Sequence, residues 1–413
     1  MLDTIFMYCK HEFVILILKG WKIMQRGGYA DLPLHYGHVP TWLAERMSKL
    51  GLAIIESIVA DFGSDEVLTR LSDPFWFQSL GCVMGMDWHS SGITASVMGA
   101  LKRAVNPRSR ELGIFICGGR GKASRQTPQE LMEIADKRGL DGDYLVRCSK
   151  LSAKVDNTAV QDGFQLYLHS FIISEKGNWS VVQQGMNTDS KMARRYHWHS
   201  EGISSFVEEP HAFIYGKNQG LIINMTDRGA TGARQALVGL ASENPSAIMN
   251  EIKRLKMPVR HNVAEQDIDS KRLGATLALA WDESIADFES LLLLKGLGPR
   301  TMQSLALISE VIYGTPVRFT DPARFSFTHG GKDGHPFPVK TVTYDASIEF
   351  LRDALRRARL GENDKKQALQ NLSKAAFALE SSRNPKAHFD ELMKKEWRES
   401  KQYGGRTVFD KMD

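Results

Sequence analysis

Residues 291–321, LLLLKGLGPRTMQSLALISEVIYGTPVRFTD, place groups suited to phosphate binding a short distance before an aspartate that could act in catalysis. An apolar run leads into Gly296-Leu297-Gly298, and Pro299 opens a second helical pattern. Two glycines permit a tight turn and a close approach to a ligand, and the first turn of the next helix offers free amides at its positive end. The pattern predicts a helix-hairpin-helix that holds a DNA phosphate through Gly296, Gly298, Arg300 and Thr301.

Binding of this kind is expected to tolerate any DNA sequence, because contacts to phosphates supply affinity without sequence information. An ordinary turn between two packed helices is the alternative for an isolated Gly-x-Gly.

A second candidate phosphate contact is the glycine-rich run Gly118-Gly119-Arg120-Gly121-Lys122, which lies between a predicted strand and a predicted helix. Backbone amides and cations at such a junction can hold a phosphate. The spacing of a P-loop is absent, so the run does not indicate an NTPase. We expect nucleic-acid contacts from Arg120, Lys122 and Arg125, with a solvated basic loop as the alternative.

A third candidate is the segment ARRYHWHS at residues 193–200, which alternates cations with aromatic rings. That combination suits contact with backbone charge and stacking on bases. The residues expected to bind are Arg194, Arg195, Tyr196 and Trp198. The alternative is a rim of aromatic side chains that closes the core.

Carboxylates could carry two different reactions. Asp321 could stabilise positive charge on a sugar during base excision or direct water to it. Asp156 and Asp162, on a predicted strand and its approach, are candidates for a magnesium site of a nuclease. A solvated polar sheet face is the alternative for this strand, which also carries Gln165, Tyr167 and His169.

The glycine-rich loop after Asp321 could close over a substrate, or it could be a surface turn. Its candidate pocket residues are His329, Lys332 and His335.

Gly314-Thr315-Pro316 and the seven-residue step from Gly314 to Asp321 resemble the segment after the hairpin in the endonuclease III superfamily of DNA glycosylases. The resemblance implies that Asp321 is the catalytic aspartate. Arg300 occupies the place of the lysine that attacks the sugar in bifunctional members, and arginine stays protonated, which argues against Schiff-base chemistry. No four-cysteine cluster follows, so no iron–sulfur centre is implied, and the glycosylase reaction needs no cofactor.

A second resemblance runs along nearly the whole chain from Met24. It is carried by phrases such as GYADLPLHYGHVP, LSDPFWFQSLGCVMGMDWHSSG, CGGRGKASRQTP and FTHGGKDGHPFPV, which resemble the prokaryotic family catalogued as domain of unknown function 763. This family brings no mechanism. Because the resemblance begins at Met24, residues 1–23 are interpreted as an N-terminal extension from a start assigned too early, with a genuine packed amphipathic helix as the alternative.

Composition indicates a globular protein in a reducing compartment. The chain has 413 residues, 42% hydrophobic and 24% charged, which is enough for a substantial core. A net charge of +5 permits nucleic-acid binding without requiring it. Four scattered cysteines without a C-x-x-C pair favour the cytoplasm over a disulfide framework. The apolar run at 13–18 is too short to span a membrane, so no membrane partner is expected.

The pattern of elements predicts an α+β fold. Helical periodicity covers 39–70 and 127–140, a buried strand covers 112–117, and strand alternation at 164–173 and 179–184 around Lys176-Gly177-Asn178 predicts a β-hairpin. Further strands are expected at 212–216 and 221–225, followed mainly by helices. The expected division is an α+β domain at 24–230 with a central antiparallel sheet, a helical domain at 231–345 with the helix-hairpin-helix, and a charged helical tail at 346–413.

The sequence therefore predicts a DNA-binding protein of repair or processing, with a glycosylase-like activity as the favoured function. Two alternative functions remain open. A metal-dependent nuclease would use the central sheet and magnesium. A non-catalytic protein would bind DNA and leave it intact.

Overall fold

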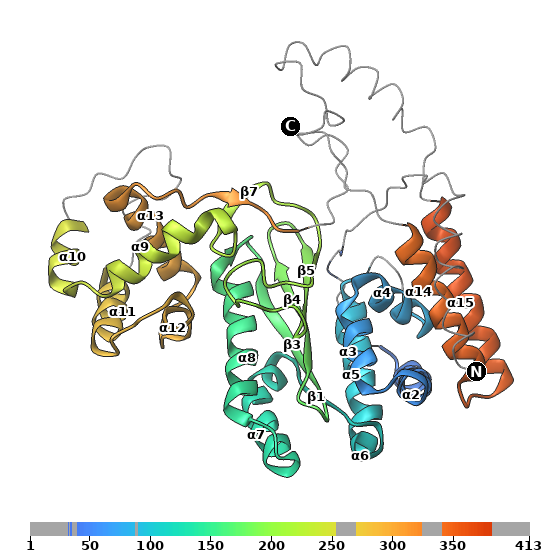
Figure 1. The fold of residues 1–413 in the computed structure, drawn as a ribbon. Coiled ribbons are helices and arrows are strands. Elements are labelled where there is room, and N and C mark those ends of the chain that lie inside the picture. Colours follow the sequence, from blue (N-terminus) through green and yellow to red (C-terminus); the bar gives the residue numbers. More distant parts are fainter. Residues whose placement is uncertain are drawn as a thin grey trace, which may run out of the picture.

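A central antiparallel sheet organises the molecule. The computed structural model describes residues 32, 34, 39–86, 90–252, 270–323 and 341–381. Its five-stranded sheet has the order β1-β3-β4-β5-β6 (Figure 1). The strands are β1 (Ile114–Arg120), β3 (Gln165–Ser174), β4 (Trp179–Asn187), β5 (Met192–His199) and β6 (Phe213–Tyr215). The predicted α+β class is confirmed.

The β3-β4 hairpin forms where the sequence predicts it. Gly177 has φ of 86°, a conformation that favours glycine, and it makes the tight connection between the two strands. Residues of β3 and β4 pair from Gln165↔Met186 to Ile173↔Trp179. β5 then pairs along β4 and supplies large buried side chains, among them Tyr196 and Trp198.

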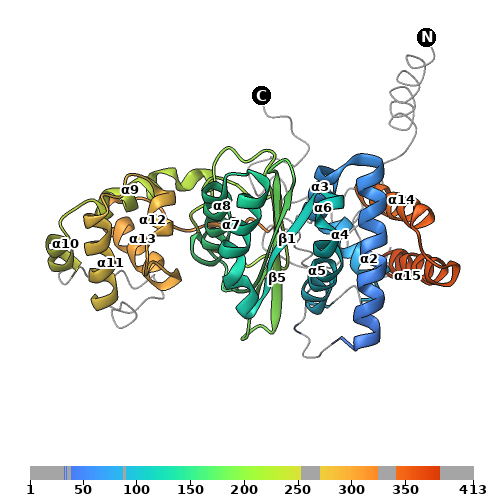
Figure 2. The ribbon, with the colours of Figure 1, turned by 90° about the horizontal axis from the view of Figure 1, so that it is seen from below.

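A helical layer covers one face of the sheet (Figure 2). Its apolar core joins sheet residues such as Ile116, Ile172 and Val182 to the helices. The layer contains α2 (Thr41–Phe62), α3 (Ser64–Ser72), α4 (Pro74–Val83), α5 (Gly92–Val105) and α6 (Ser109–Leu112), with η1 at Asn106–Arg108. Helices α3, α5 and α6 pack against the strands, and α2 packs on α3 and α5.

Two helices near the C-terminus, α14 (Thr341–Arg357) and α15 (Glu362–Ser381), complete this layer by packing on α2 and α4. Leu351, Leu355 and Leu372 bury their side chains in the same core, and Arg357 pairs with Asp61 at 2.6 Å. The described part of the predicted tail is therefore an integral part of the body and not an appendage, because its apolar stripe is covered.

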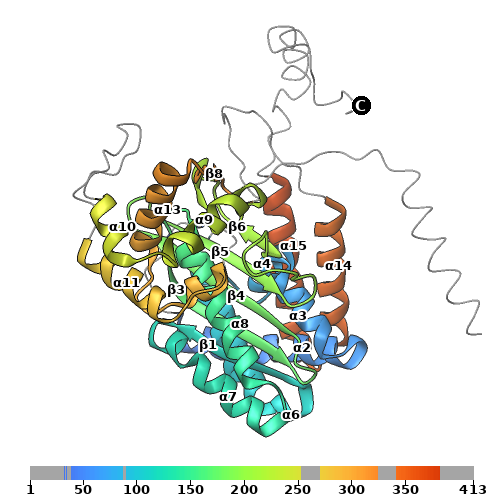
Figure 3. The same cartoon turned by 60° about the vertical axis from the view of Figure 1, so that its left-hand side comes forward.

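The opposite face of the sheet carries η2 (Gly121–Gln126), α7 (Thr127–Arg138) and α8 (Gly142–Lys154), and α8 lies along the strands (Figure 3). The π-helix η3 (Val155–Ala159) follows α8. Beyond them lies the helical group α9 (Thr231–Ala241), α10 (Pro245–Ile252), α11 (Ser270–Asp282), α12 (Phe288–Leu293) and α13 (Pro299–Tyr313).

This group shares one apolar core with α8 and the sheet, from Cys117 to Ala323, so buried contacts continue across the division expected near residue 230. A small sheet of order β2-β7-β8 links the two parts. Its strands are β2 (Val160–Gln161), β7 (Leu221–Asn224) and β8 (Phe319–Thr320), and η4 (Arg228–Ala230) precedes α9. Among the described residues, no helix combines the length and apolar character needed to cross a bilayer.

Candidate nucleic-acid interface

The turn between α12 and α13 is built around one buried leucine. Leu297 is 2% exposed and packs in the core with Leu291 and Leu294. Gly296 before it has φ of 91°, in the region that favours glycine. Gly298 is extended, with φ of −131°, and occupies the N-cap position of the fifteen-residue helix α13. The sequence thus produces two helices joined by a tight turn that exposes backbone.

Side chains from the neighbouring elements fix the turn from behind. The Lys154 amine at the end of α8 donates to the Leu297 carbonyl at 2.6 Å, and the Gln161 amide donates to the Pro299 carbonyl at 2.9 Å. A trans peptide is planar, so a Leu297 carbonyl held toward Lys154 directs the Gly298 N–H away from it. Burial lowers the pKa of Lys154.

Lys295, Gly296 and Arg300 are exposed at the turn. Glycine at the N-cap supplies no side-chain acceptor and Pro299 has no N–H, so the N–H groups of Arg300 and Thr301 are the first donors of α13 without a side-chain cap. The placement of Thr301 differs from the prediction, because the residue is only 4% exposed and its side chain faces the interior. A phosphate contact from the Thr301 side chain is therefore not supported, whereas Gly296, Gly298 and Arg300 have the expected placement.

The second predicted basic segment, η2, lies on the same side of the sheet. Arg120, Lys122 and Arg125 are exposed. The segment is anchored at Gly118, where a Cβ would come within 2.3 Å of the His169 carbonyl and 2.5 Å of the Thr127 hydroxyl. His169 in turn contacts the Ser149 hydroxyl of α8 at 2.9 Å.

The α12–α13 turn thus contacts the C-terminal end of α8 directly, and Gly118 before η2 is connected to Ser149 of α8 through His169. There Lys150 is exposed and Lys154 contacts the turn. Sequence reasoning missed Lys154 and Gln161, because each is more than a hundred positions from the turn and no local pattern connects them. We call Lys122, Arg125, Lys150, Lys295 and Arg300 the basic face. Arg120, the last residue of β1, does not belong to it, because its guanidinium lies 5.8 Å from the ring of Tyr167 on the other face of the sheet.

The third predicted segment is buried, and its predicted role is wrong. Arg194, Arg195, Tyr196 and Trp198 form part of β5 and have 0% exposure, so they cannot touch a nucleic acid in this structure. Strand alternation sends Arg194, Tyr196 and Trp198 to the α8 face and Arg195 to the helical layer. The alternative, aromatic side chains that belong to the core, describes this segment.

Arg194 joins two aspartates in a buried ion cluster. Its guanidinium contacts Asp162 at 2.7 Å and Asp321 at 2.6 Å, and all three side chains have 0% exposure. The Tyr196 hydroxyl also donates to Asp162, at 2.7 Å. Burial acts against the charge of Arg194, but the two carboxylates raise its pKa above the ordinary value.

This cluster corrects the expected role of Asp321. Besides its contacts with Arg194, the Asp321 carboxylate accepts hydrogen bonds from the backbone N–H of Gln219 at 2.7 Å and from the backbone N–H of Ala323 at 2.9 Å. A carboxylate that is enclosed and bonded in this way connects the small sheet to β5, and it is not placed to meet a sugar. The predicted pocket residues His329, Lys332 and His335 lie outside the described residues.

The predicted magnesium ligands are also occupied by protein donors. Asp162 belongs to the Arg194 cluster, and Asp156 in η3 accepts from Gln183, His211 and Trp198, the last at 2.9 Å. No group of three or more metal-ligating side chains occurs among the residues that the structure describes. The arrangement therefore gives no support to Asp156 and Asp162 as a metal site.

The polar strand face expected at Gln165, Tyr167 and His169 is divided between two faces. A β-bulge between Leu166 and Leu168 changes the register. Tyr167 then contacts Gln184, while His169 contacts the adjacent Gln183 at 2.7 Å on the other face. Burial lowers the pKa of His169. Tyr167 and His169 thus belong to buried networks on opposite faces, and the solvated alternative is also wrong for them.

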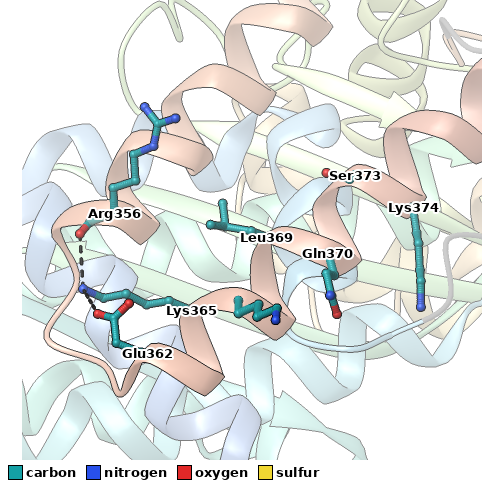
Figure 4. Close-up of a pocket in the computed structure, with 8 residues that line it drawn as sticks. Arg356, Glu362, Lys365, Leu369, Gln370, Ser373 and Lys374 are labelled. Carbon is teal, nitrogen blue, oxygen red and sulfur yellow. Dashed lines mark hydrogen bonds and ion pairs between the residues drawn. The ribbon is translucent and has the colours of Figure 1, made fainter.

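A separate basic groove of about 910 Å³ lies on α15 and the end of α14 (Figure 4). Lys365 bonds the Arg356 carbonyl at 3.3 Å and pairs with Glu362 at 3.8 Å. In Figure 1 these helices are at the opposite end of the molecule from α12 and α13. The groove is lined by Arg356, Glu362, Lys365, Lys366, Leu369, Gln370, Ser373 and Lys374.

The fold and the basic face define an α+β protein with a rigid, cation-bearing turn between two helices. The chain belongs to the DUF763 family, described as proteins of unknown function, whose profile matches residues 28–339. The groove on α14 and α15 lies beyond that match. Neither a curated protein nor a solved structure matches the chain.

Proposed function

We propose that the protein binds duplex DNA through phosphates, with the α12–α13 turn as the main contact and η2 as the second. The observation that carries this proposal is the held turn, which leaves the positive end of a fifteen-residue helix without a side-chain cap and has exposed Lys295 and Arg300 beside it. Such a helix end favours an anion. Because the turn is already fixed by the hydrogen bonds from Lys154 and Gln161, binding a phosphate there would cost little conformational entropy.

Two contacts on one side of the sheet suit a polymer with regularly spaced charges. The turn is bonded to Lys154 at one end of α8, and η2 leads into α7, which packs against α8. A duplex lying over this end of α8 would meet cations from both segments. Because the proposed ligands are phosphates, binding is expected to be sequence-tolerant and to weaken steeply with salt.

Binding that leaves DNA intact is the form of the proposal that the described side chains support best. Base excision relied on Asp321, and cleavage with magnesium relied on Asp156 and Asp162. All three carboxylates are buried and bonded to protein donors. The proposal therefore assigns the protein to DNA repair or processing as a binding component.

The test is fluorescence anisotropy with duplexes of unrelated sequence over a range of salt concentrations. Arg300→Gln should weaken binding to every duplex and reduce the slope of log affinity against log salt by about 1. Gly298→Val should weaken it further, because the extended backbone accepts a side chain but the phosphate loses its space. An added Cβ would lie 3.5 Å from Arg272, an ordinary contact, so folding should be retained.

Arg110→Gln is the matched control. Arg110 is exposed in α6, before β1 begins, whereas η2 follows the end of β1. Its removal changes the net charge equally and should leave affinity nearly unchanged. If Arg300→Gln and Gly298→Val bind as tightly as Arg110→Gln, the turn is not the DNA contact.

A further inference from the structure

Arg195 is a fully buried cation with only neutral partners. Its Nε donates to the His197 ring at 2.8 Å. Its two terminal nitrogens make long bonds of 3.4 Å, one to the Thr94 hydroxyl and one to the Pro74 carbonyl. The rings of Phe77 and Tyr215 lie 4.5 Å and 4.9 Å from the guanidinium carbon.

No carboxylate among the described residues forms an ion pair with Arg195. The charge of its neighbour Arg194, in contrast, is balanced by ion pairs with two aspartates. A buried charge without a partner is costly. Burial lowers the pKa of Arg195 to about 10, so the guanidinium still carries its charge at neutral pH.

His197 cannot supply the missing negative charge. Its Nδ1 lies 2.9 Å from the Leu71 carbonyl, which requires a proton on Nδ1, and its Nε2 accepts from Arg195. The ring is therefore neutral, and burial together with the Arg195 charge lowers its pKa well below the ordinary value. The cluster of Arg195, His197 and Thr94 keeps one net positive charge.

We propose that Arg195 is the binding residue for an oxyanion, the phosphate or carboxylate group of a small ligand. The two terminal nitrogens would exchange their long bonds to neutral oxygens for a charge-assisted fork of about 2.7–2.9 Å. Phe75 follows Pro74 in α4, and Phe213 lies two residues from Tyr215 on β6. The two rings are half-buried, lie in edge-to-face contact with centroids 6.4 Å apart, and pack with Leu34 and Tyr215, so a ligand would have to part these side chains to reach Arg195.

This site is distinct from the proposed DNA interface. Arg195 faces the helical layer formed by α3, α4 and α5, whereas the α12–α13 turn lies beyond α8 on the other side of the sheet (Figure 2). A buried guanidinium next to a hydroxyl and two rings suits one discrete anionic group. It does not suit the continuous backbone of a duplex.

The test is equilibrium dialysis of the full chain with labelled inorganic phosphate and, separately, labelled acetate, at constant ionic strength set by chloride. One of the two anions should bind at a saturable site that is retained in Arg300→Gln, the variant that weakens the proposed phosphate contact of the α12–α13 turn. Arg195→Gln should abolish this binding, and Arg195→Lys, which keeps the charge but loses the fork, should weaken it about tenfold or more. The stronger of the two anions identifies the ligand as a phosphate or a carboxylate.

Arg110→Gln is the control, since it removes an exposed cation of α6 that lies outside the basic face and should leave anion binding unchanged. Arg195→Gln should in turn keep duplex affinity, so the failure of one proposal is separable from the failure of the other. If Arg195→Gln does not fold, the Arg195→Lys comparison decides. The proposal is overturned if neither anion binds saturably to the wild-type chain, or if the Arg195 variants bind as the wild type does.

Discussion

At the scale of single residues, the adjacent arginines of β5 show how strand alternation sets electrostatics. Arg194 and Arg195 are both fully buried, but they point to opposite faces. Arg194 meets Asp162 and Asp321, and Arg195 meets neutral groups alone among the described residues. A sequence pattern of two arginines beside aromatic residues indicates surface cations. Only the position of β5 inside the sheet shows that both are internal.

The ion cluster predicts that Asp321 is needed for stability. Asp321→Asn should lower the free energy of unfolding by about 3 kcal/mol, because it removes one of two carboxylates from a buried guanidinium. Urea denaturation measures this change. Asp189→Asn, an equal charge change at an exposed position, is the control and should have little effect. An unchanged urea midpoint for Asp321→Asn would contradict the assigned structural role.

The buried histidines predict a loss of stability in mild acid. Burial lowers the pKa of His169 and, more strongly, that of His197 below the ordinary value of 6.5. The unfolded chain therefore binds protons first as pH falls. Stability should be complete above about pH 6.5 and should then fall by up to about 1.4 kcal/mol per pH unit for each histidine. Urea denaturation between pH 8 and pH 5 measures the slope.

His197→Gln should flatten that slope, because glutamine can accept from Arg195 and donate to the Leu71 carbonyl without titrating. A slope equal to that of the wild type would show that His197 already binds a proton in the folded state.

At the scale of elements, the junction between β1 and α7 depends on one glycine. Gly118 has φ of 78°, and a Cβ there would lie 2.3 Å from the His169 carbonyl. Gly118→Ala should therefore cost about 3 kcal/mol, from backbone strain and overpacking together. Gly121→Ala, with φ of 60° and no atom within 4 Å, should cost only about 1 kcal/mol. Equal urea midpoints for the two variants would contradict this view.

Local patterns predicted the elements whose signals are local. The β3-β4 hairpin follows from alternation on both sides of Lys176-Gly177-Asn178, and α13 follows from Pro299 and the apolar spacing behind it. A turn joins α12 and α13 at Gly296 and Gly298, and its identity as a helix-hairpin-helix stays a prediction. Its use as a DNA contact stays a prediction.

Pairing across the chain could not be predicted from the same patterns. Asp321 meets Arg194, which lies 127 residues earlier, and Lys154 meets Leu297, which lies 143 residues later. The bulge in β3 changed which face each polar residue occupies, and periodicity alone does not reveal a bulge. The exposure of Lys122, Arg125 and Arg300 was therefore predictable from single segments, whereas the burial of Thr301 was not. The candidate site was not predictable where burial removes a charged residue from the surface.

At the scale of the whole molecule, one sheet separates two apolar cores. The first joins β5 and α8 to the helical group around α13, and the second joins β1 and β4 to α2, α4 and α14. The basic face lies with the first core. Of the rings around Arg195, Phe77 belongs to the second core, and Tyr215 packs in a small third cluster with Leu32 and Ala193. This division places the two proposed sites on opposite sides of the sheet and allows each to be altered separately.

The second core predicts that α14 contributes to global stability although it lies beyond the DUF763 match. Leu351 has 0% exposure and packs among residues of α2 and α4. Leu351→Ala should lower the free energy of unfolding by about 3 kcal/mol, from lost burial and the cavity left behind. Urea denaturation followed by tryptophan fluorescence measures it, because Trp76, Trp179 and Trp198 are all buried.

Leu221→Ala is the control, since Leu221 is 77% exposed and its truncation should change stability by less than about 0.5 kcal/mol. An independent appendage would give another result: Leu351→Ala would leave the main transition unchanged, or would separate an early minor transition from it. A single transition that shifts as a whole would instead show that the helices after residue 340 fold with the sheet as one cooperative unit.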